Sequence, residues 1–212
     1  MLAAGLTSFV VLLFSLCFHE ASHAWMARRI GDHTAEHEGR ITLNPLAHID
    51  PLGTLVIPLL QIFTGIPLIG WAKPTPYNAG NFNRDVSLAR GHVLVAAAGP
   101  ISNLILAAGF TGVLFLLVRV LGAGLSDAPR ALLVHGIQIN VALAIFNFFP
   151  LPPLDGSKVA SWGLPRSLGE RYDRIFEPVG QWLLLLLVVT GVLKLVLSPI
   201  VGFVLGLIQA LI

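Results

Sequence analysis

Residues 18–25 read FHEASHAW, which places two histidines and a glutamate inside a segment that otherwise has the composition of a membrane helix. The apolar run begins at residue 2, and the helical pattern continues to about residue 30. An ionisable side chain costs at least ~2.5 kcal/mol at the centre of an inserted helix, so such residues within a span indicate function. The rest of the chain must therefore supply the other residues of the functional site to which this cluster belongs.

The composition of the whole chain supports a membrane protein. Of its 212 residues, 55% are hydrophobic and only 11% are charged, whereas soluble domains carry ~25% charged residues. The formal charge of +2 and the scattered basic residues argue against a nucleic-acid partner, and the single cysteine, Cys17, excludes an internal disulfide. We expect one integral membrane domain over residues 1–212, embedded in the lipid bilayer, with no room for a sizeable soluble domain.

Apolar runs of helix-spanning length predict an all-α polytopic fold with about 4–6 transmembrane segments. The predicted spans cover about residues 2–30, 91–121, 131–149 and 179–198. Residues 52–70 are also apolar but are interrupted by Pro58 and Pro67. Pro199 is expected to end the helix 179–198, and residues 200–212 form an apolar tail that is short for a span.

The segment HEASH fits the pattern H-E-x-x-H. Positions i and i+4 share one face of a helix, so His19 and His23 can both reach one metal ion. Glu20 is adjacent to the first ligand, where a carboxylate can accept the proton of a water molecule that zinc activates. The alternative is that all three residues lie at the membrane surface with Glu20 simply solvated.

A second cluster competes for the metal. Residues 33–37, HTAEH, read H-x-x-E-H, the inverted order that some zinc enzymes use. That order needs a continuous helix, whereas Gly31-Asp32 before it and Gly39 after it favour a loop. We interpret this cluster as a solvated loop.

A catalytic zinc ion takes three protein ligands and keeps one position open. The best candidate for the third ligand is Asp155, in the segment PLPPLDG, where several prolines prevent regular helix after an apolar segment. Irregular backbone at membrane depth is tolerated only against protein or a wet cavity, so this carboxylate can turn inward. The alternative is that Asp155-Gly156 is only a helix-ending turn.

Three motifs follow one another along the chain: HEASH in an early helix, AGPISN (98–103) at a middle span, and FNFFPLPPLDG (146–156) at the end of a later one. Together they resemble the site-2 protease family of intramembrane zinc metalloproteases, over residues from about 10 to 160. The resemblance implies one zinc ion per chain, bound by His19, His23 and Asp155, with Glu20 as the general base. It also implies a role for Asn147, and for Asn103, around the substrate or transition state.

The resemblance implies further features at the edges of the site. The segment GWAKPTPYN (70–78) resembles the small membrane-associated β element that pairs with an extended substrate, although Pro74 and Pro76 limit which residues can pair. The chain has no room for a PDZ domain between its spans, so it resembles the compact subgroup. His48, in NPLAHIDPLG, could approach the site as an outer partner or extra ligand, or belong to a turn at the membrane surface.

The depth of the metal ligands restricts the topology. His19 lies past the middle of its predicted span and Asp155 follows the span 131–149, so these two helices should run in the same direction, with an odd number of crossings between them. Of the two apolar segments between them, 52–70 contains the prolines, and we expect it to be re-entrant or interfacial. Lys and Arg residues then divide ten against three between the two sides, whereas they divide seven against six if 52–70 spans. The positive-inside rule therefore places the active site toward the cytosol.

These features predict hydrolysis of peptide bonds in or near transmembrane segments of membrane-protein substrates. The predicted location is the inner membrane of a prokaryote, in a multi-pass protein. The sequence names neither the substrate nor the oligomeric state. The alternative function is a non-proteolytic membrane metal-binding protein, such as a carrier, a channel or a degenerate scaffold. A membrane diiron oxygenase needs more His and carboxylate ligands than the one strong motif provides.

Overall fold

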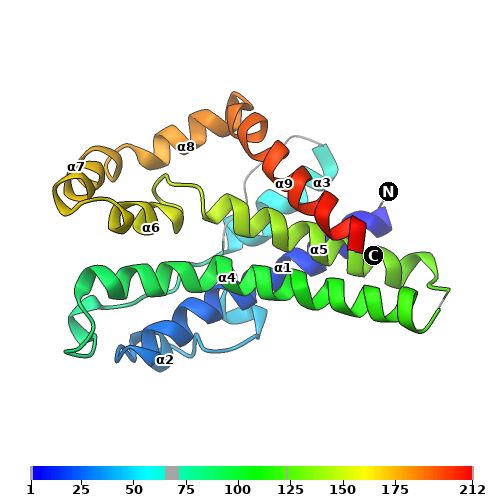
Figure 1. Cartoon of the computed structure of the whole chain (residues 1–212), viewed down its shortest axis with the longest axis horizontal. Coiled ribbons are helices and arrows are strands. Elements are labelled where there is room, and N and C mark those ends of the chain that lie inside the picture. The colour runs from blue at the N-terminus through cyan, green and yellow to red at the C-terminus, as the bar shows by residue number, and fades with distance from the viewer. Residues whose placement is uncertain (1, 65–71, 123, 212) are drawn as a thin grey trace.

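The computed structural model describes residues 2–64, 72–122 and 124–211, and within these ranges every regular element is a helix (Figure 1). Four helices are long and apolar enough to cross a membrane, so the chain is a multi-pass membrane protein. They are α1 (Leu2–Arg29), α4 (Leu88–Phe115) with its π-helical extension η4 (Leu116–Val120), α5 (Asp127–Asn147) and α9 (Val192–Leu211).

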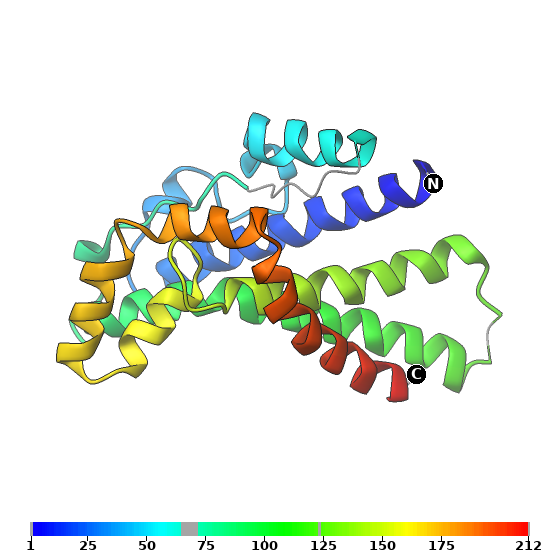
Figure 2. The same ribbon diagram turned by 90° about the horizontal axis from the view of Figure 1, so that it is seen from above.

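Helices α1, α4 and α5 pack against one another and form the core of the molecule. Helices α1 and α5 run in the same direction and α4 runs in the opposite one, as the position of the metal ligands predicted (Figure 2). The α4–α5 contact is apolar and close. At Gly136 of α5, a Cβ atom would lie 2.7 Å from the ring of Phe110, so only glycine fits there.

Short helices lie between α1 and α4: α2 (Thr34–His37), η1 (Pro45–Ala47), η2 (Pro51–Val56), α3 (Ile57–Thr64) and η3 (Ala79–Asn81). The continuous pair η2–α3 has 14 residues from Pro51 to Thr64, and a helix of that length rises only about 21 Å, against about 30 Å of hydrocarbon. The predicted re-entrant path of 52–70 continues into residues 65–70, which lie outside the described residues.

The predicted β element is not observed in the described part of its segment. Residues 72–78 contain no strand, and residues 70 and 71 lie outside the described ranges. Pro74 and Pro76 have no amide hydrogen, and the amide of Lys73 donates to the carbonyl of His48 instead of to a partner strand. The amide of Thr75 is bonded to a side chain. A regular ladder therefore lacks its donors here.

The C-terminal third differs from the sequence prediction. It forms α6 (Gly156–Gly163), α7 (Arg166–Phe176), α8 (Gly180–Val189) and α9. The chain turns at Gly191, whose φ of +75° favours glycine, so the predicted helix 179–198 is divided there. Pro199 does not end a helix but lies inside α9, which includes the tail that was predicted to be too short to span. Proline is tolerated inside membrane helices where neighbours satisfy the freed carbonyl.

Candidate metal centre

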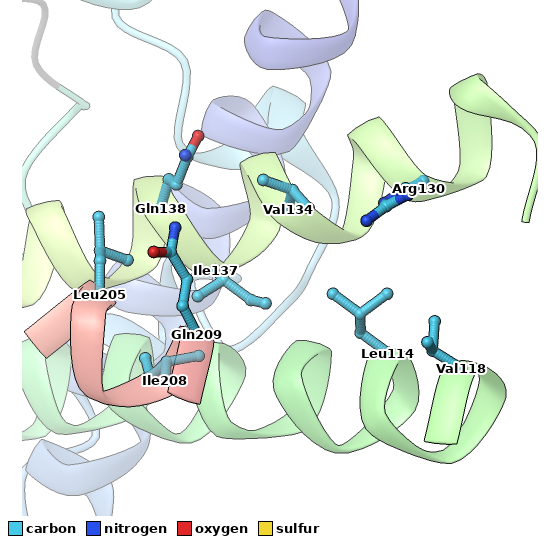
Figure 3. Close-up of a pocket in the computed structure, with 9 residues that line it drawn as sticks. All are labelled: Leu114, Val118, Arg130, Val134, Ile137, Gln138, Leu205, Ile208 and Gln209. Carbon is cyan, nitrogen blue, oxygen red and sulfur yellow. The ribbon is translucent and has the colours of Figure 1, made fainter. Parts of the chain in front are cut away.

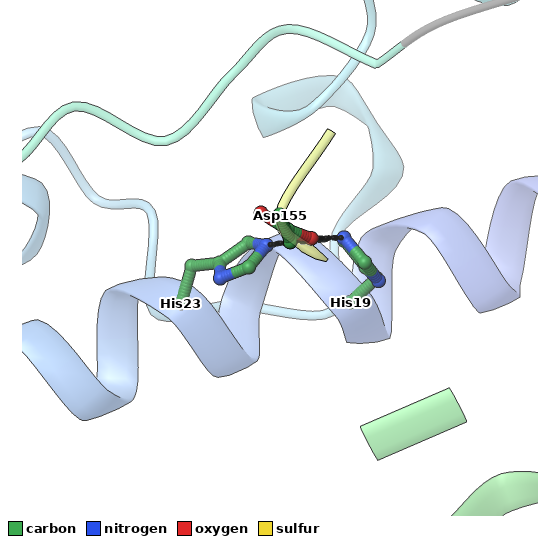
Figure 4. Close-up of side chains that lie close together, drawn as sticks. All are labelled: His19, His23 and Asp155. Carbon is green, nitrogen blue, oxygen red and sulfur yellow. Dashed lines mark hydrogen bonds and ion pairs between the residues drawn. The ribbon is translucent and has the colours of Figure 1, made fainter. Parts of the chain in front are cut away.

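Two histidines of α1 and an aspartate from the start of α6 meet at one point (Figure 4). His19 and His23 lie one turn apart, and their Nε2 atoms are 3.0 Å from each other. Asp155 Oδ2 lies 3.2 Å from His19 Nε2 and 3.4 Å from His23 Nε2. One ligand atom from each residue thus falls within 4.8 Å of the other two. Both histidines are buried, although they stand on a membrane helix.

The hydrogen bond behind His23 fixes its tautomer. His23 Nδ1 lies 2.7 Å from the carbonyl oxygen of Val95 on α4. A carbonyl oxygen only accepts, so Nδ1 of His23 must carry the hydrogen. In the neutral ring this leaves the lone pair on Nε2, which faces the centre of the site.

The tautomer of His19 is fixed by a longer chain of hydrogen bonds through buried residues. Asn140 Nδ2 lies 2.9 Å from the carbonyl oxygen of Gly136, so that atom is a donor and Oδ1 of Asn140 is an acceptor. Asn103 Nδ2 donates to this oxygen at 2.9 Å, and Asn103 Oδ1 then faces His19 Nδ1 at 2.7 Å. Nδ1 of His19 therefore carries the hydrogen, and its Nε2 lone pair also faces the centre.

This donor set fits a zinc ion. Two imidazole lone pairs and a carboxylate converge, and Asp155 Oδ2 is buried without a hydrogen-bond partner among the described residues. Three acceptors in contact need a cation between them. Zinc bonds of about 2.0–2.1 Å at tetrahedral angles place ligand atoms about 3.3 Å apart, and the three observed separations are 3.0, 3.2 and 3.4 Å.

Glycine in the AGPISN motif allows α4 to lie directly behind the two histidines. A Cβ atom at Gly99 would collide with the ring of His23 and lie 2.6 Å from Cε1 of His19. Val95, Gly99 and Asn103 of α4 all lie against the ligand histidines, and they are spaced four residues apart on one helix face. The motif therefore belongs to the outer wall of the metal site.

Glu20 lies on the open side of the site. It lines a cavity of about 510 Å³ together with both histidines, Asp155 and Asn147. Its carboxylate is held by the irregular segment before α4: Oε2 of Glu20 accepts from the amide of Thr75 at 2.9 Å and lies 2.8 Å from the Thr75 hydroxyl. A carboxylate next to two metal ligands and open to a cavity has the place of a general base.

The remaining predicted site residues lie in three different environments. Asn147 is the last residue of α5 and lines the cavity, with Nδ2 donating to the carbonyl of Leu143 at 3.0 Å. Asn103 is fully buried behind His19 and does not line the cavity. His48 is buried, its Nε2 lies 2.9 Å from the carbonyl oxygen of Thr42, and it is not one of the converging ligands.

The competing H-x-x-E-H cluster does not gather around a metal position. His33 and Glu36 pair directly at 2.6 Å, and Glu36 also pairs with Arg28 at 3.2 Å. The hydrogen bond from His33 lowers the pKa of the Glu36 carboxyl. In the described ranges no second group of three metal-binding side chains converges. The prediction of a loop is wrong for residues 34–37, which form the one-turn helix α2, but His33 and Glu36 pair with each other at the surface and do not converge on a metal position.

A second cavity, of about 290 Å³, lies between α4, α5 and α9 (Figure 3). Its polar lining residues are Arg130, Gln138 and Gln209, and the rest of its lining is apolar. None of its lining residues in the described part of the chain is His, Cys, Asp or Glu.

Several functional contacts were not predicted from the sequence. The residues are Ser15, Asp32, Thr75, Val95 and Asn140. Asn140 carried a usable signal, since an amide in a membrane helix seeks a hydrogen-bond partner. Thr75 and Val95 carried none, because their roles depend on which atoms the fold brings beside Glu20 and His23.

The site has the composition of a catalytic zinc centre, with a carboxylate and an open cavity beside it, and it lies inside a bundle of membrane-crossing helices. These features define the class of the protein as a membrane-embedded zinc metallopeptidase. Curated relatives agree. Zinc metalloprotease YwhC of Bacillus subtilis is 37% identical over 199 residues, which cover 91% of this chain and 84% of YwhC. Rip2 of Mycolicibacterium smegmatis and MJ0611 of Methanocaldococcus jannaschii, also named zinc metalloproteases, are 34% and 30% identical.

The matched part covers 84% of this chain and 63% of Rip2, and 68% of this chain and 64% of MJ0611. It therefore spans slightly less than two thirds of these two relatives. No family model matches the chain, and no solved structure matches it. With YwhC matched over most of both sequences, the chain belongs to the site-2 protease family of intramembrane zinc metalloproteases.

Proposed function

We propose that this protein hydrolyses peptide bonds in or near transmembrane segments of membrane proteins. The observation that carries the proposal is the position of Glu20, which faces the same cavity as the converging ligands His19, His23 and Asp155. Zinc held by these three side chains would supply the Lewis acidity that activates a water molecule and polarises the scissile carbonyl.

Residues around the cavity would then transfer the proton, bind the substrate and orient the metal ligands. Glu20 takes one proton from the attacking water, whose oxygen bonds to the carbonyl carbon, and delivers it to the leaving nitrogen as the carbon–nitrogen bond breaks. Asn147 lines the same cavity with an uncharged amide and donates a hydrogen bond to the substrate carbonyl or backbone. Asn103 acts behind His19, where it orients the ligand instead of touching substrate.

The cellular setting is also a proposal. We place the protein in the inner membrane of a prokaryote, with the metal centre toward the cytosolic face, because that topology collects most basic residues on one side. A substrate helix hides its own amides and must unwind before its carbonyl can enter the cavity. Tyr77 lines the cavity on the irregular segment 72–78, and its amide has no partner among the described residues. This amide is a position at which an extended substrate could pair.

The test compares membrane peptides in cells that produce the wild type or Glu20→Gln, identified by mass spectrometry. We expect the variant to retain zinc and to accumulate uncleaved single-span proteins, whereas Asp155→Ala loses zinc as well. Glu170→Gln, at an exposed position of α7, serves as the matched control and should behave as wild type. Unchanged fragments with Glu20→Gln would favour a non-proteolytic metal-binding protein.

A further inference from the structure

The segment 73–78 (KPTPYN), here called the strap, passes over the open side of the metal centre and is anchored at both ends. The amide of Lys73 donates to the carbonyl of His48 at 2.9 Å, and Arg40 Nη2 donates to the carbonyl of Pro74 at 3.2 Å. At the other end, the amide of Asn78 donates to Oδ2 of Asp32 at 2.7 Å. Arg40 and Asp32 are both buried, so the strap is fixed from behind by charged groups inside the protein.

Thr75, in the middle of the strap, is directed at Glu20. Its amide lies 2.9 Å from Oε2 of Glu20, and its hydroxyl oxygen lies 2.8 Å from the same atom and 3.0 Å from the Glu20 carbonyl oxygen. The hydroxyl has one hydrogen, which it can direct to either acceptor. The amide thus holds Oε2, the hydroxyl can direct its hydrogen to the same oxygen, and none of the described residues donates to the other oxygen, Oε1.

The sequence of the strap makes Thr75 a rigid support. Pro74 and Pro76 flank it, and each proline ring fixes its own φ near −65°. A residue that precedes proline is further restricted to extended conformations, so Pro76 restricts Thr75 as well. Little conformational entropy is therefore lost when Thr75 holds its donors toward Glu20.

The strap is poorly suited to the alternative role of a continuous edge for substrate. Two of its six residues are prolines without an amide hydrogen, and the amides of Lys73, Thr75 and Asn78 already donate within the protein. Most backbone amides of the strap therefore donate to groups of the protein itself and are not free to pair with a substrate.

We propose that Thr75 is a positioning residue for the general base: it holds Oε2 of Glu20 and leaves Oε1 as the oxygen that meets the attacking water. The inference rests on the proposed role of Glu20. A carboxylate that must exchange a proton within one turnover needs a fixed orientation, because misplacement of about 1 Å can cost a hundredfold in rate. The strap supplies that orientation from outside the ligand helix.

The test is steady-state cleavage of a fluorescein-labelled single-span peptide in proteoliposomes, with the peptide taken from the fragments that wild type releases. Thr75→Val removes the hydroxyl and keeps the shape and the amide. We expect kcat to fall about tenfold, as for loss of one hydrogen bond to a charged acceptor, with KM and zinc content unchanged. Thr75→Ser should restore kcat to within about twofold of wild type, since it retains the donor.

Two controls separate positioning from a general structural effect. Thr111→Val removes a hydroxyl that donates to the Ala107 carbonyl of α4 far from the cavity, and it should leave kcat unchanged. In the Glu20→Gln background, Thr75→Val should cause no further decrease in the residual rate, because the group that it orients is already gone. Thr75→Ala, which also lacks the hydroxyl, should match Thr75→Val if the loss comes from the donor and not from packing.

The possible outcomes distinguish this inference from the proposed function. If Glu20→Gln cleaves as well as wild type, the proposed role of Glu20 is wrong and the inference falls with it. If Glu20→Gln is inactive but Thr75→Val retains full kcat, only the role of Thr75 is overturned. The inference is also overturned if Thr75→Ser is as slow as Thr75→Val, or if Thr75→Val slows the Glu20→Gln enzyme further by the same factor.

Discussion

Asn103 determines which nitrogen of His19 faces the metal position, although it is fully buried and does not line the cavity. Its own orientation depends on Asn140, which is fixed by the Gly136 carbonyl and also donates to the hydroxyl of Ser15 at 2.9 Å. Three helices thus contribute to the state of one imidazole. Mutation of residues that hydrogen-bond to a metal ligand commonly changes the metal affinity by tenfold to a hundredfold.

We predict that Asn103→Leu weakens zinc binding by about 10–100-fold, because His19 Nδ1 loses its acceptor and the ring loses its fixed tautomer. Asn140→Leu should weaken it less, since Asn103 keeps a second acceptor at 3.4 Å in the Ser15 carbonyl. The measurement is competition for zinc with a chelating indicator in detergent. Gln138→Leu, an exposed amide on α5, is the control. Equal affinity of Asn103→Leu and wild type would contradict this role.

At the scale of the helix pair, the approach of α4 to α1 depends on the absence of a side chain at Gly99. We predict that Gly99→Ala lowers zinc content, because the added methyl overlaps the His23 ring and both ligand rings must move. Gly109→Ala on the same helix meets no atom within 4 Å and should retain zinc, with stability unchanged or slightly increased. Zinc per chain by mass spectrometry of the purified proteins measures both. A full complement of zinc in Gly99→Ala would show that α4 can move aside.

The junction between α1 and the strap carries a prediction on pH. Burial alone would raise the pKa of Asp32, but the hydrogen bonds from Thr34, Asn81 and the Asn78 amide outweigh it and hold that pKa below the usual 3.8. A lowered pKa in the folded state means that Asp32 contributes its full stability above pH 3.8 and loses it as pH falls through the lower folded value.

We therefore expect Asp32→Asn to lower the free energy of unfolding by about 2 kcal/mol at neutral pH, as for loss of a hydrogen-bonded charge. The deficit should begin to shrink below about pH 4, where Asp32 of the unfolded chain becomes protonated, and it should disappear once the pH falls below the lower pKa of the folded state. Thermal unfolding in detergent at several pH values measures it. Asp85→Asn, at an exposed position, is the control. A deficit that persists unchanged at low pH would rule out this charge as the cause.

The elements that could be predicted from the sequence are those in which spacing alone carries the information. The four-residue spacing of His19 and His23 places both on one helix face, and the requirement for a common depth predicted the shared direction of α1 and α5. The contacts of Val95 and Thr75 depend on helix rotation and on the path of an irregular segment, which no local pattern encodes. The break at Gly191 was missed because Pro199 is the stronger breaker in isolation, whereas inside a membrane helix it is tolerated.

At the scale of the whole molecule, the hydrogen bonds to Asp32 bear on the topology. The loop after α1 and the strap are joined by the contact of Asn78 with Asp32, so both lie at the same end of the helix bundle. If residues 52–70 crossed the bilayer, this contact would have to bridge its hydrocarbon core of about 30 Å. Both termini lie toward the opposite end (Figure 2).

Cysteine labelling tests this topology directly. In a Cys17→Ala background, we place single cysteines at three exposed positions, Glu38→Cys, Asp85→Cys and Asp127→Cys. In intact cells a membrane-impermeant maleimide should label only Asp127→Cys, because the positive-inside rule puts the other two in the cytosol. After permeabilisation all three should react. Labelling of Glu38→Cys and Asp85→Cys from opposite sides would mean that 52–70 spans, and labelling of both from outside would reverse the orientation and place the metal centre toward the outer face.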